Sequence, residues 1–131
     1  MTGRHPEIEA QHHQLIELFQ QHRLTLLAGE LGKALQQLQN LHQVQAAHIT
    51  LEETELLPRL DTDARWPAKV YLAEHRKLEV MLAQLMGGLK DLPGQTRDAT
   101  LILRLLEREM PFKHVLEHHF EREEKALLRE S

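Results

Sequence analysis

Residues 48–58 read HITLEETELLP, and residues 119–128 read HFEREEKALL. Each stretch begins with a histidine that is followed four residues later by a glutamate, His48 with Glu52 and His119 with Glu123. Four residues make about one turn of an α-helix, so the two side chains of each pair lie on one helix face. A core pattern alone would repeat leucines, and it has no reason to repeat histidine and glutamate in register. The repeat therefore indicates that imidazole and carboxylate groups act together on two helices.

The duplication extends upstream of both stretches. Residues 10–15 align with residues 73–78, which pairs His12 with His75. The chain thus reads as two similar halves, each contributing one lone histidine and one histidine–glutamate pair.

Apolar residues recur at spacings of three and four, which predicts helices over about residues 6–28, 32–57, 67–90 and 98–128. Pro6 and Pro67 suit helix starts, Asp98 suits an N-cap, and Pro111 predicts a kink in the last helix. Strand-favouring residues are scarce. We therefore expect an all-α, up-down-up-down four-helix bundle that forms a single domain over residues 1–131.

Composition excludes several classes of protein. The chain has no cysteine, so disulfides and thiolate metal sites are ruled out. A net charge of -4 gives no basic surface for nucleic acid. No apolar run approaches the roughly 18 residues of a membrane span, and the N-terminus has no signal-peptide core. We expect a cytoplasmic protein that binds neither nucleic acid nor membrane, and protein partners are not indicated.

The ten histidines separate by helix face. Four share a face with leucine, valine, isoleucine or phenylalanine and are predicted to point inward, namely His12, His48, His75 and His119. The other six are expected to be ordinary surface or core residues, namely His5, His13, His22, His42, His114 and His118. Among these, His22 shares a face with Phe19 but lies far along the helix from His12.

Six inward residues then form the candidate site: His12, His48, Glu52, His75, His119 and Glu123. Burying carboxylates without a cation is very costly, so a bound cation is expected. Four histidines and two glutamates on four helices can hold two metal ions with both carboxylates bridging them. No catalytic residue and no organic cofactor site is indicated.

This six-position pattern, with the flank from His48 to Pro58, resembles the hemerythrin-like, cation-binding His-His-Glu family. The resemblance covers nearly the whole chain. It implies a non-haem di-iron site in a four-helix bundle, with an oxo or hydroxo ligand between the irons. His12 and His48 would bind one iron, His75 and His119 the other, and Glu52 and Glu123 would bridge them.

Two departures separate the chain from oxygen-carrying hemerythrins. Those have a second histidine one turn after the third-helix ligand, where this chain has Glu79, and a His-x-x-x-x-Asp motif where this chain has His119-x-x-x-Glu123. Glu79 is either a further carboxylate ligand or marks an open position. The pattern is also similar to the di-iron domain of proteins implicated in iron-centre repair and nitric oxide response, which carry an additional cysteine-bearing segment.

The leading functional hypothesis is a di-iron protein that binds or senses oxygen or nitric oxide. The alternatives are a di-iron oxidase, peroxidase, nitric oxide reductase or iron-centre repair protein, and, in a different class, a metal-free or zinc-bound helical interaction module. Tyr71, one turn before His75, is interpreted as a core or rim tyrosine. The competing hypothesis is a phenol that hydrogen-bonds a bridging glutamate or binds iron.

Overall fold

Proline and glycine set the ends of the first two helices in this computed structural model, which describes residues 5–131. Helix α1 spans Pro6–Leu27, with the proline in its first turn, where a missing N–H costs nothing. Helix α2 spans Leu31–Leu51 and continues without a loop into a π-helical turn, η1 (Glu52–Leu56), and a 3₁₀ turn, η2 (Leu57–Arg59). The predicted second helix is therefore right in extent, but its last part is not α-helical.

The second half of the chain repeats this plan. Helix α3 spans Ala68–Lys90, and α4 spans Ala99–Arg108. The Asp98 carboxylate accepts hydrogen bonds from the backbone N–H groups of Thr100 and Leu101 at 3.0 and 3.2 Å, which confirms the predicted N-cap. Helix α5 (Met110–Arg122) leads into a second π-helical turn, η3 (Glu123–Leu127), and a final turn, α6 (Leu128–Glu130).

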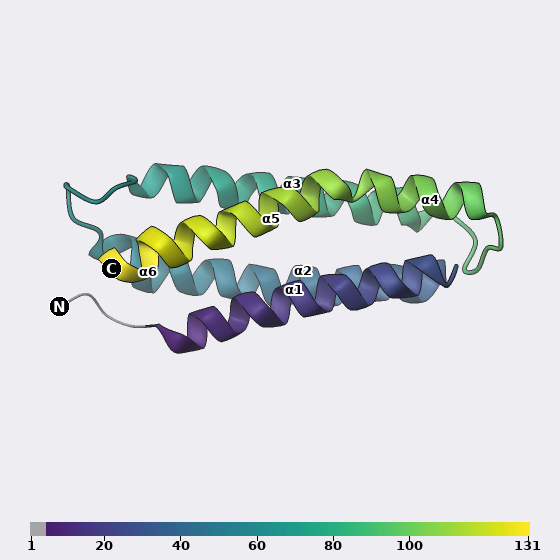
Figure 1. Cartoon of the computed structure of the whole chain (residues 1–131), viewed down its shortest axis with the longest axis horizontal. Helices are drawn as coiled ribbons and strands as arrows, with labels where there is room; N and C mark the ends of the chain where they lie inside the picture. The colour runs from purple at the N-terminus through teal and green to yellow at the C-terminus, as the bar shows by residue number, and fades with distance from the viewer. Residues whose placement is uncertain (1–4) are drawn as a thin grey trace.

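These elements form four antiparallel rods, with the start of α1 and the end of α6 at the same end of the molecule (Figure 1). Helix α1 packs against α2 and α4, and α3 packs against α2 and α5. The all-α four-helix bundle predicted from the sequence is confirmed. Within residues 5–131, no helix has both the length and the apolar character needed to span a membrane.

Pro111 interrupts the fourth rod, as predicted, and side chains of α1 contact the interruption. Arg23 donates from Nη1 to the carbonyl of Leu106 and to Oε1 of Glu109, each at 3.0 Å. The buried ring of His22 donates from Nδ1 to the carbonyl of Ala34 at 2.8 Å and contacts Oε2 of Glu109 through Nε2 at 2.6 Å. The break therefore has a polar clamp that ties the rods together.

Gly29 ends the turn after α1 in a left-handed conformation, with φ of 78°. A Cβ atom at this position would lie 2.1 Å from the carbonyl oxygen of Thr96. The backbone N–H of Thr96 also donates to the carbonyl of Gly29 at 2.9 Å. Glycine thus lets two loops at one end of the bundle pack directly against each other.

The apolar core is divided into two clusters. The larger runs from Leu15 and Phe19 to Leu116 and Phe120, and the smaller gathers around Ile8 and Tyr71 near the chain ends. In α1 His12 lies between Ile8 of the smaller cluster and Leu15 of the larger, and in α3 His75 lies between Tyr71 and Leu78 in the same way. The site is therefore a polar layer closed by apolar residues on both sides.

Candidate metal centre

The structure brings all six candidate residues together in this layer. Helices α1, α2, α3 and α5 each contribute one histidine, and the two π-helical turns contribute the glutamates. Every one of the six is at most 4% exposed, and both glutamates are fully buried. The six are His12, His48, Glu52, His75, His119 and Glu123.

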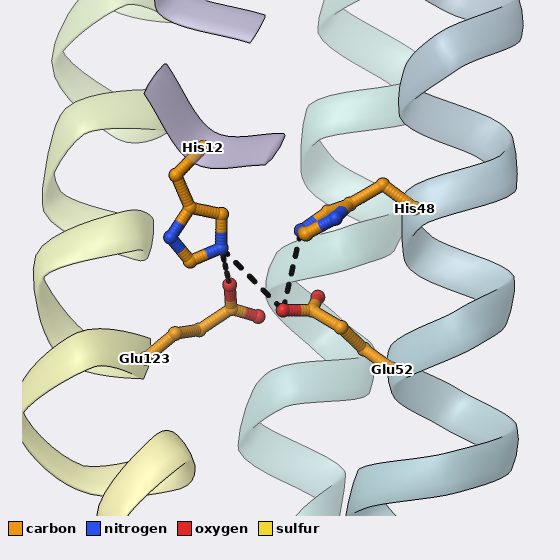
Figure 2. A group of neighbouring side chains, drawn as sticks. All are labelled: His12, His48, Glu52 and Glu123. Atoms are coloured by element: carbon orange, nitrogen blue, oxygen red, sulfur yellow. Dashed lines mark ion pairs between the residues drawn. The ribbon is translucent and has the colours of Figure 1, made fainter. Parts of the chain in front are cut away.

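The two glutamates each present one oxygen to either side of the cluster. Oε2 of Glu52 lies 3.2 Å from Nε2 of His48, and its Oε1 lies 3.1 Å from Nε2 of His75. Oε1 of Glu123 lies 2.9 Å from Nε2 of His12, and its Oε2 lies 2.8 Å from Nε2 of His119. Figure 2 shows the two carboxyl groups facing one another below the imidazoles of His12 and His48.

The cluster therefore divides into two half-sites that share both glutamates. The first half-site has His12 and His48, and the second has His75 and His119. Within each group of four, the facing nitrogen and oxygen atoms all lie within 4.8 Å of one another. Two cations could thus be held side by side, bridged by the two carboxylates.

Both glutamates begin a π-helical turn, Glu52 in η1 and Glu123 in η3. Such turns interrupt an α-helix where a local shift of register is required, and they are common at functional sites. Here each turn follows a histidine–glutamate pair that is still in α-helical register. In each turn the residue after the glutamate contacts a histidine on a neighbouring rod, Glu53 with His75 and Glu124 with His12.

Each cluster histidine uses its second ring nitrogen to hold its orientation. Nδ1 of His12 donates to Glu124, Nδ1 of His75 to Glu53 and Nδ1 of His119 to Glu74, at 2.9, 2.8 and 2.9 Å. Nδ1 of His48 donates to the amide oxygen of Gln11 at 2.6 Å. The acceptors are therefore Gln11, Glu53, Glu74 and Glu124. A proton fixed on Nδ1 leaves Nε2 to point at the cluster centre, which is the arrangement that metal-binding histidines adopt.

Ring packing reinforces these orientations. The imidazole of His12 stacks on the ring of Phe120, with centroids 4.1 Å apart and an interplanar angle of 12°. Within each half-site the two imidazoles meet edge to face, at 4.9 Å in both cases. The similar geometry of the two half-sites follows from the internal duplication of the sequence.

Without a cation, protons compensate the buried carboxylates. Burial disfavours a charged imidazole, but close contacts with the carboxylates of Glu123 and Glu52 outweigh it and raise the pKa of His12 and of His75 to about 10. Burial likewise opposes the charge on His119, and the negative charge of Glu123 together with its hydrogen bond raises the His119 pKa to about 9. Burial would raise the pKa of the two glutamates, and their like charges add to this for Glu52, yet the histidine contacts leave both values lowered.

Four buried polar atoms in the first half-site lie close enough together to contact one cation. They have no hydrogen-bond partner within residues 5–131, although they approach one another to between 2.9 and 3.6 Å. They are Nε2 of His12, Nε2 of His48, Oε2 of Glu52 and Oε1 of Glu123. Imidazole nitrogens and carboxylate oxygens are ligands for zinc, iron and similar divalent ions, so the donor set fits a metal.

Comparison with known proteins agrees with this geometry. The profile of the family described as "Hemerythrin HHE cation binding domain" matches residues 5–130. The chain belongs to the hemerythrin HHE cation-binding family. No curated protein and no solved structure gives a significant match to it.

The remaining histidines of this hemerythrin HHE domain lie outside the cluster. His13, His114 and His118 are exposed, and His5 and His42 are partly buried. His22 is buried, but it belongs to the clamp around Glu109, as its predicted distance from His12 along the helix requires.

The structure also bears on two residues near the cluster, Glu79 and Tyr71, for which the sequence left alternatives. Glu79 is exposed and is not part of either group of potential ligands, which favours the alternative of an open position over that of a further carboxylate ligand. Residue 79 follows His75 by four positions, but α3 directs it to solvent. Tyr71 is fully buried, and its hydroxyl has no hydrogen-bond partner within the described chain. This placement agrees with a core tyrosine.

The four Nδ1 acceptors were not predicted from the sequence. They are partly exposed, with Glu124 at 37%, Glu53 at 35% and Glu74 at 23%, so a pattern of helix faces classes them with surface residues. A signal was present in the duplication. Gln11 and Glu74 each precede a lone histidine, and Glu53 and Glu124 each follow a cluster glutamate.

Proposed function

We propose that this domain holds two iron ions, one in each half-site, and that it binds or senses a small diatomic ligand, oxygen or nitric oxide. The observation that carries the proposal is the arrangement of Glu52 and Glu123. Each carboxylate has one oxygen toward the first half-site and one toward the second. Such an arrangement suits a pair of cations. A single cation would leave one oxygen of each glutamate without a metal to bind.

Each half-site supplies four donors, two imidazole nitrogens and one oxygen from each glutamate. An ion that takes six ligands would keep positions beyond these four protein donors, for a bridging oxo or hydroxo ligand and for an external ligand. Four donors would instead complete a tetrahedral zinc site, leaving no position for a ligand. A role in ligand binding therefore favours iron over zinc, and mixed nitrogen and oxygen donors with open positions are typical of non-haem iron.

The surroundings favour a very small ligand. The six candidate ligands are at most 4% exposed, and apolar clusters close the layer on both sides. A substrate of more than a few atoms would have to displace core leucines. An apolar wall also limits access of water to the site.

When bound, two neighbouring irons can share two electrons with one oxygen molecule, which a single iron does poorly. The protein's own part is to fix the donors. The four Nδ1 contacts orient the imidazoles, and the stacked ring of Phe120 holds His12 in place.

The test begins with metal analysis of protein loaded with iron under anaerobic conditions, with zinc-loaded protein as the control. Two irons per chain and a visible spectral change on adding oxygen or nitric oxide to the reduced protein would support the proposal. A persistent adduct in a stopped-flow record indicates binding, whereas rapid return with product indicates an oxidase, peroxidase or reductase. Protein that binds no iron, or iron-loaded protein whose spectrum is insensitive to both gases, would contradict the proposal.

A further inference from the structure

The two half-sites differ at one supporting position. Nδ1 of His48 donates to the amide oxygen of Gln11, whereas Nδ1 of His119 donates to a carboxylate oxygen of Glu74. Gln11 directly precedes His12, and Glu74 directly precedes His75, so the two acceptors occupy equivalent places in the duplicated chain. One acceptor is neutral and the other is an anion.

The Glu74 carboxylate is held from a second side. Nε of Arg122 donates to Oε2 of Glu74 at 3.1 Å, and the Arg122 guanidinium lies 4.4 Å from the centre of the Trp66 ring. Trp66, Arg122 and Glu74 thus form a series of contacts that ends at His119. Both oxygens of Glu74 are engaged, one by the arginine and one by the histidine.

Gln11 has a different setting. It lines a surface groove of about 450 Å³ that also reaches His48, together with Gln14, Val44, Ala47 and Leu51. In the first half-site, His48 is therefore supported by the neutral amide of Gln11, which lines a surface groove. In the second, His119 is supported by the carboxylate of Glu74, which Arg122 also contacts.

The chemical consequence concerns the strength of the imidazole donors. A carboxylate that accepts the Nδ1 proton makes the opposite nitrogen a stronger metal ligand, and a neutral amide does so less. The second half-site has two such carboxylates, Glu53 and Glu74, whereas the first has only Glu124 beside Gln11.

We propose that the two cation positions are unequal, and that Gln11 makes the position at His12 and His48 the weaker one, which loses its ion first. This inference rests on the proposed binding of two ions. Loss of a supporting carboxylate typically lowers metal affinity about 10- to 100-fold, so we expect at least a 10-fold difference between the two positions.

Metal is removed stepwise from the iron-loaded protein with a chelator. Protein from each step is crystallised, and the metal occupancy of each position is refined from anomalous scattering. When one ion per chain remains, it should occupy the position at His75 and His119. In the double variant Gln11→Glu with Glu74→Gln, the remaining ion should move to the position at His12 and His48.

Two single variants complete the design. In Gln11→Glu alone, the two ions should be released at similar chelator concentrations, because both half-sites then have two supporting carboxylates. This variant replaces the double variant if Glu74→Gln destabilises the fold by removing the partner of Arg122. Gln14→Glu adds the same charge to the same groove, but within the described residues the hydrogen bond of His48 Nδ1 goes to Gln11, so Gln14→Glu should leave the order of release unchanged.

The outcomes separate this inference from the proposed function. Equal occupancy of both positions in the half-depleted native protein, or an order that Gln11→Glu does not alter, would overturn the inference alone. Two bound irons with no response to oxygen or nitric oxide would overturn the ligand-binding function but not the inequality. Binding of a single ion per chain would overturn both.

Discussion

Glu52 and Glu123 occupy the same place in the two halves of the chain: each lies one turn after a buried histidine, and each begins a π-helical turn. Their carboxylates meet inside the bundle, where both are fully buried. Two anions at this depth are stable only with positive charge between and around them. In the metal-free protein that charge comes from protonated histidines, and a pair of cations would replace it.

The first prediction concerns the candidate ligands. Glu52→Gln and His12→Ala should each lower the iron content and reduce the stabilisation that iron gives, because ligand binding stabilises only the folded state. At a metal concentration about 100 times the Kd, metal binding raises the free energy of unfolding by about 2.7 kcal/mol, and the variants should lose part or all of this gain. Elemental analysis and thermal unfolding with and without iron measure both effects.

Matched controls exist beside both positions. Glu55 lies in the same π-helical turn as Glu52, His13 follows His12, and both are exposed. Glu55→Gln and His13→Ala should change neither the iron content nor the metal-dependent stability. The face assignment is wrong if these exposed positions matter and the buried ones do not.

The second prediction concerns pH and the metal-free protein. The pKa values of His12 and His75 are raised to about 10, and that of His119 to about 9, against about 6.5 in an unfolded chain. The folded state therefore binds more protons than the unfolded state in this interval, and its stability falls as pH rises. The contribution is complete below the unfolded value of about 6.5 and is lost as pH passes about 9 to 10.

The glutamates act in the opposite direction at acid pH. The pKa values of Glu52 and Glu123 are lowered, so their contribution is present above the ordinary glutamate value and is lost as pH falls below it. Metal-free protein should thus be most stable between about pH 5 and 6.5. Urea unfolding at a series of pH values checks this, and a stability that is unchanged from about pH 6 to about pH 9 would refute it.

The extent of the four rods and the burial of the six site residues could be predicted, because both depend on the spacing of apolar residues along a helix. His12 and His13 are separated by helix face alone, and the structure buries the first and exposes the second. Asp98 and Pro111 also act locally, one through a side-chain oxygen and the other through a missing N–H.

The π-helical turns and the Nδ1 acceptors could not be predicted in this way. The contacts of Glu53 and Glu124 join different rods, so they depend on tertiary packing and not on the pattern within one helix. Glu79 shows the same limit, because its spacing from His75 suits a ligand but the packing of α3 leaves it in solvent. Helix-face reasoning places a residue on a side of its own helix and says little about which partner it reaches.

The third prediction concerns Tyr71. Burial raises the pKa of its phenol, and the negative charges of Glu130 and Glu123 add to the effect, so the hydroxyl stays protonated. The ferric protein should therefore show no tyrosinate-to-iron absorption band. Because the hydroxyl is buried without a partner, Tyr71→Phe should leave the stability of the metal-free protein unchanged or raise it by about 1 kcal/mol. A strong visible band that disappears in Tyr71→Phe would show instead that the phenol binds iron.

The last prediction concerns the clamp at the Pro111 break, which has no part in the metal centre. Glu109 is 3% exposed and is the partner of both His22 and Arg23. Glu109→Ala removes the carboxylate and leaves the buried ring of His22 without its contact, and breaking a buried pair typically costs about 3 to 5 kcal/mol. Glu107 is exposed on the same rod, so Glu107→Ala is the matched control and should change the stability by less than about 0.5 kcal/mol. Urea unfolding of both variants gives the comparison.

In iron-loaded samples that remain folded, the metal content of the two variants should be equal, because the clamp contacts none of the six site residues. A selective loss of iron in Glu109→Ala would show that the clamp and the metal centre are coupled.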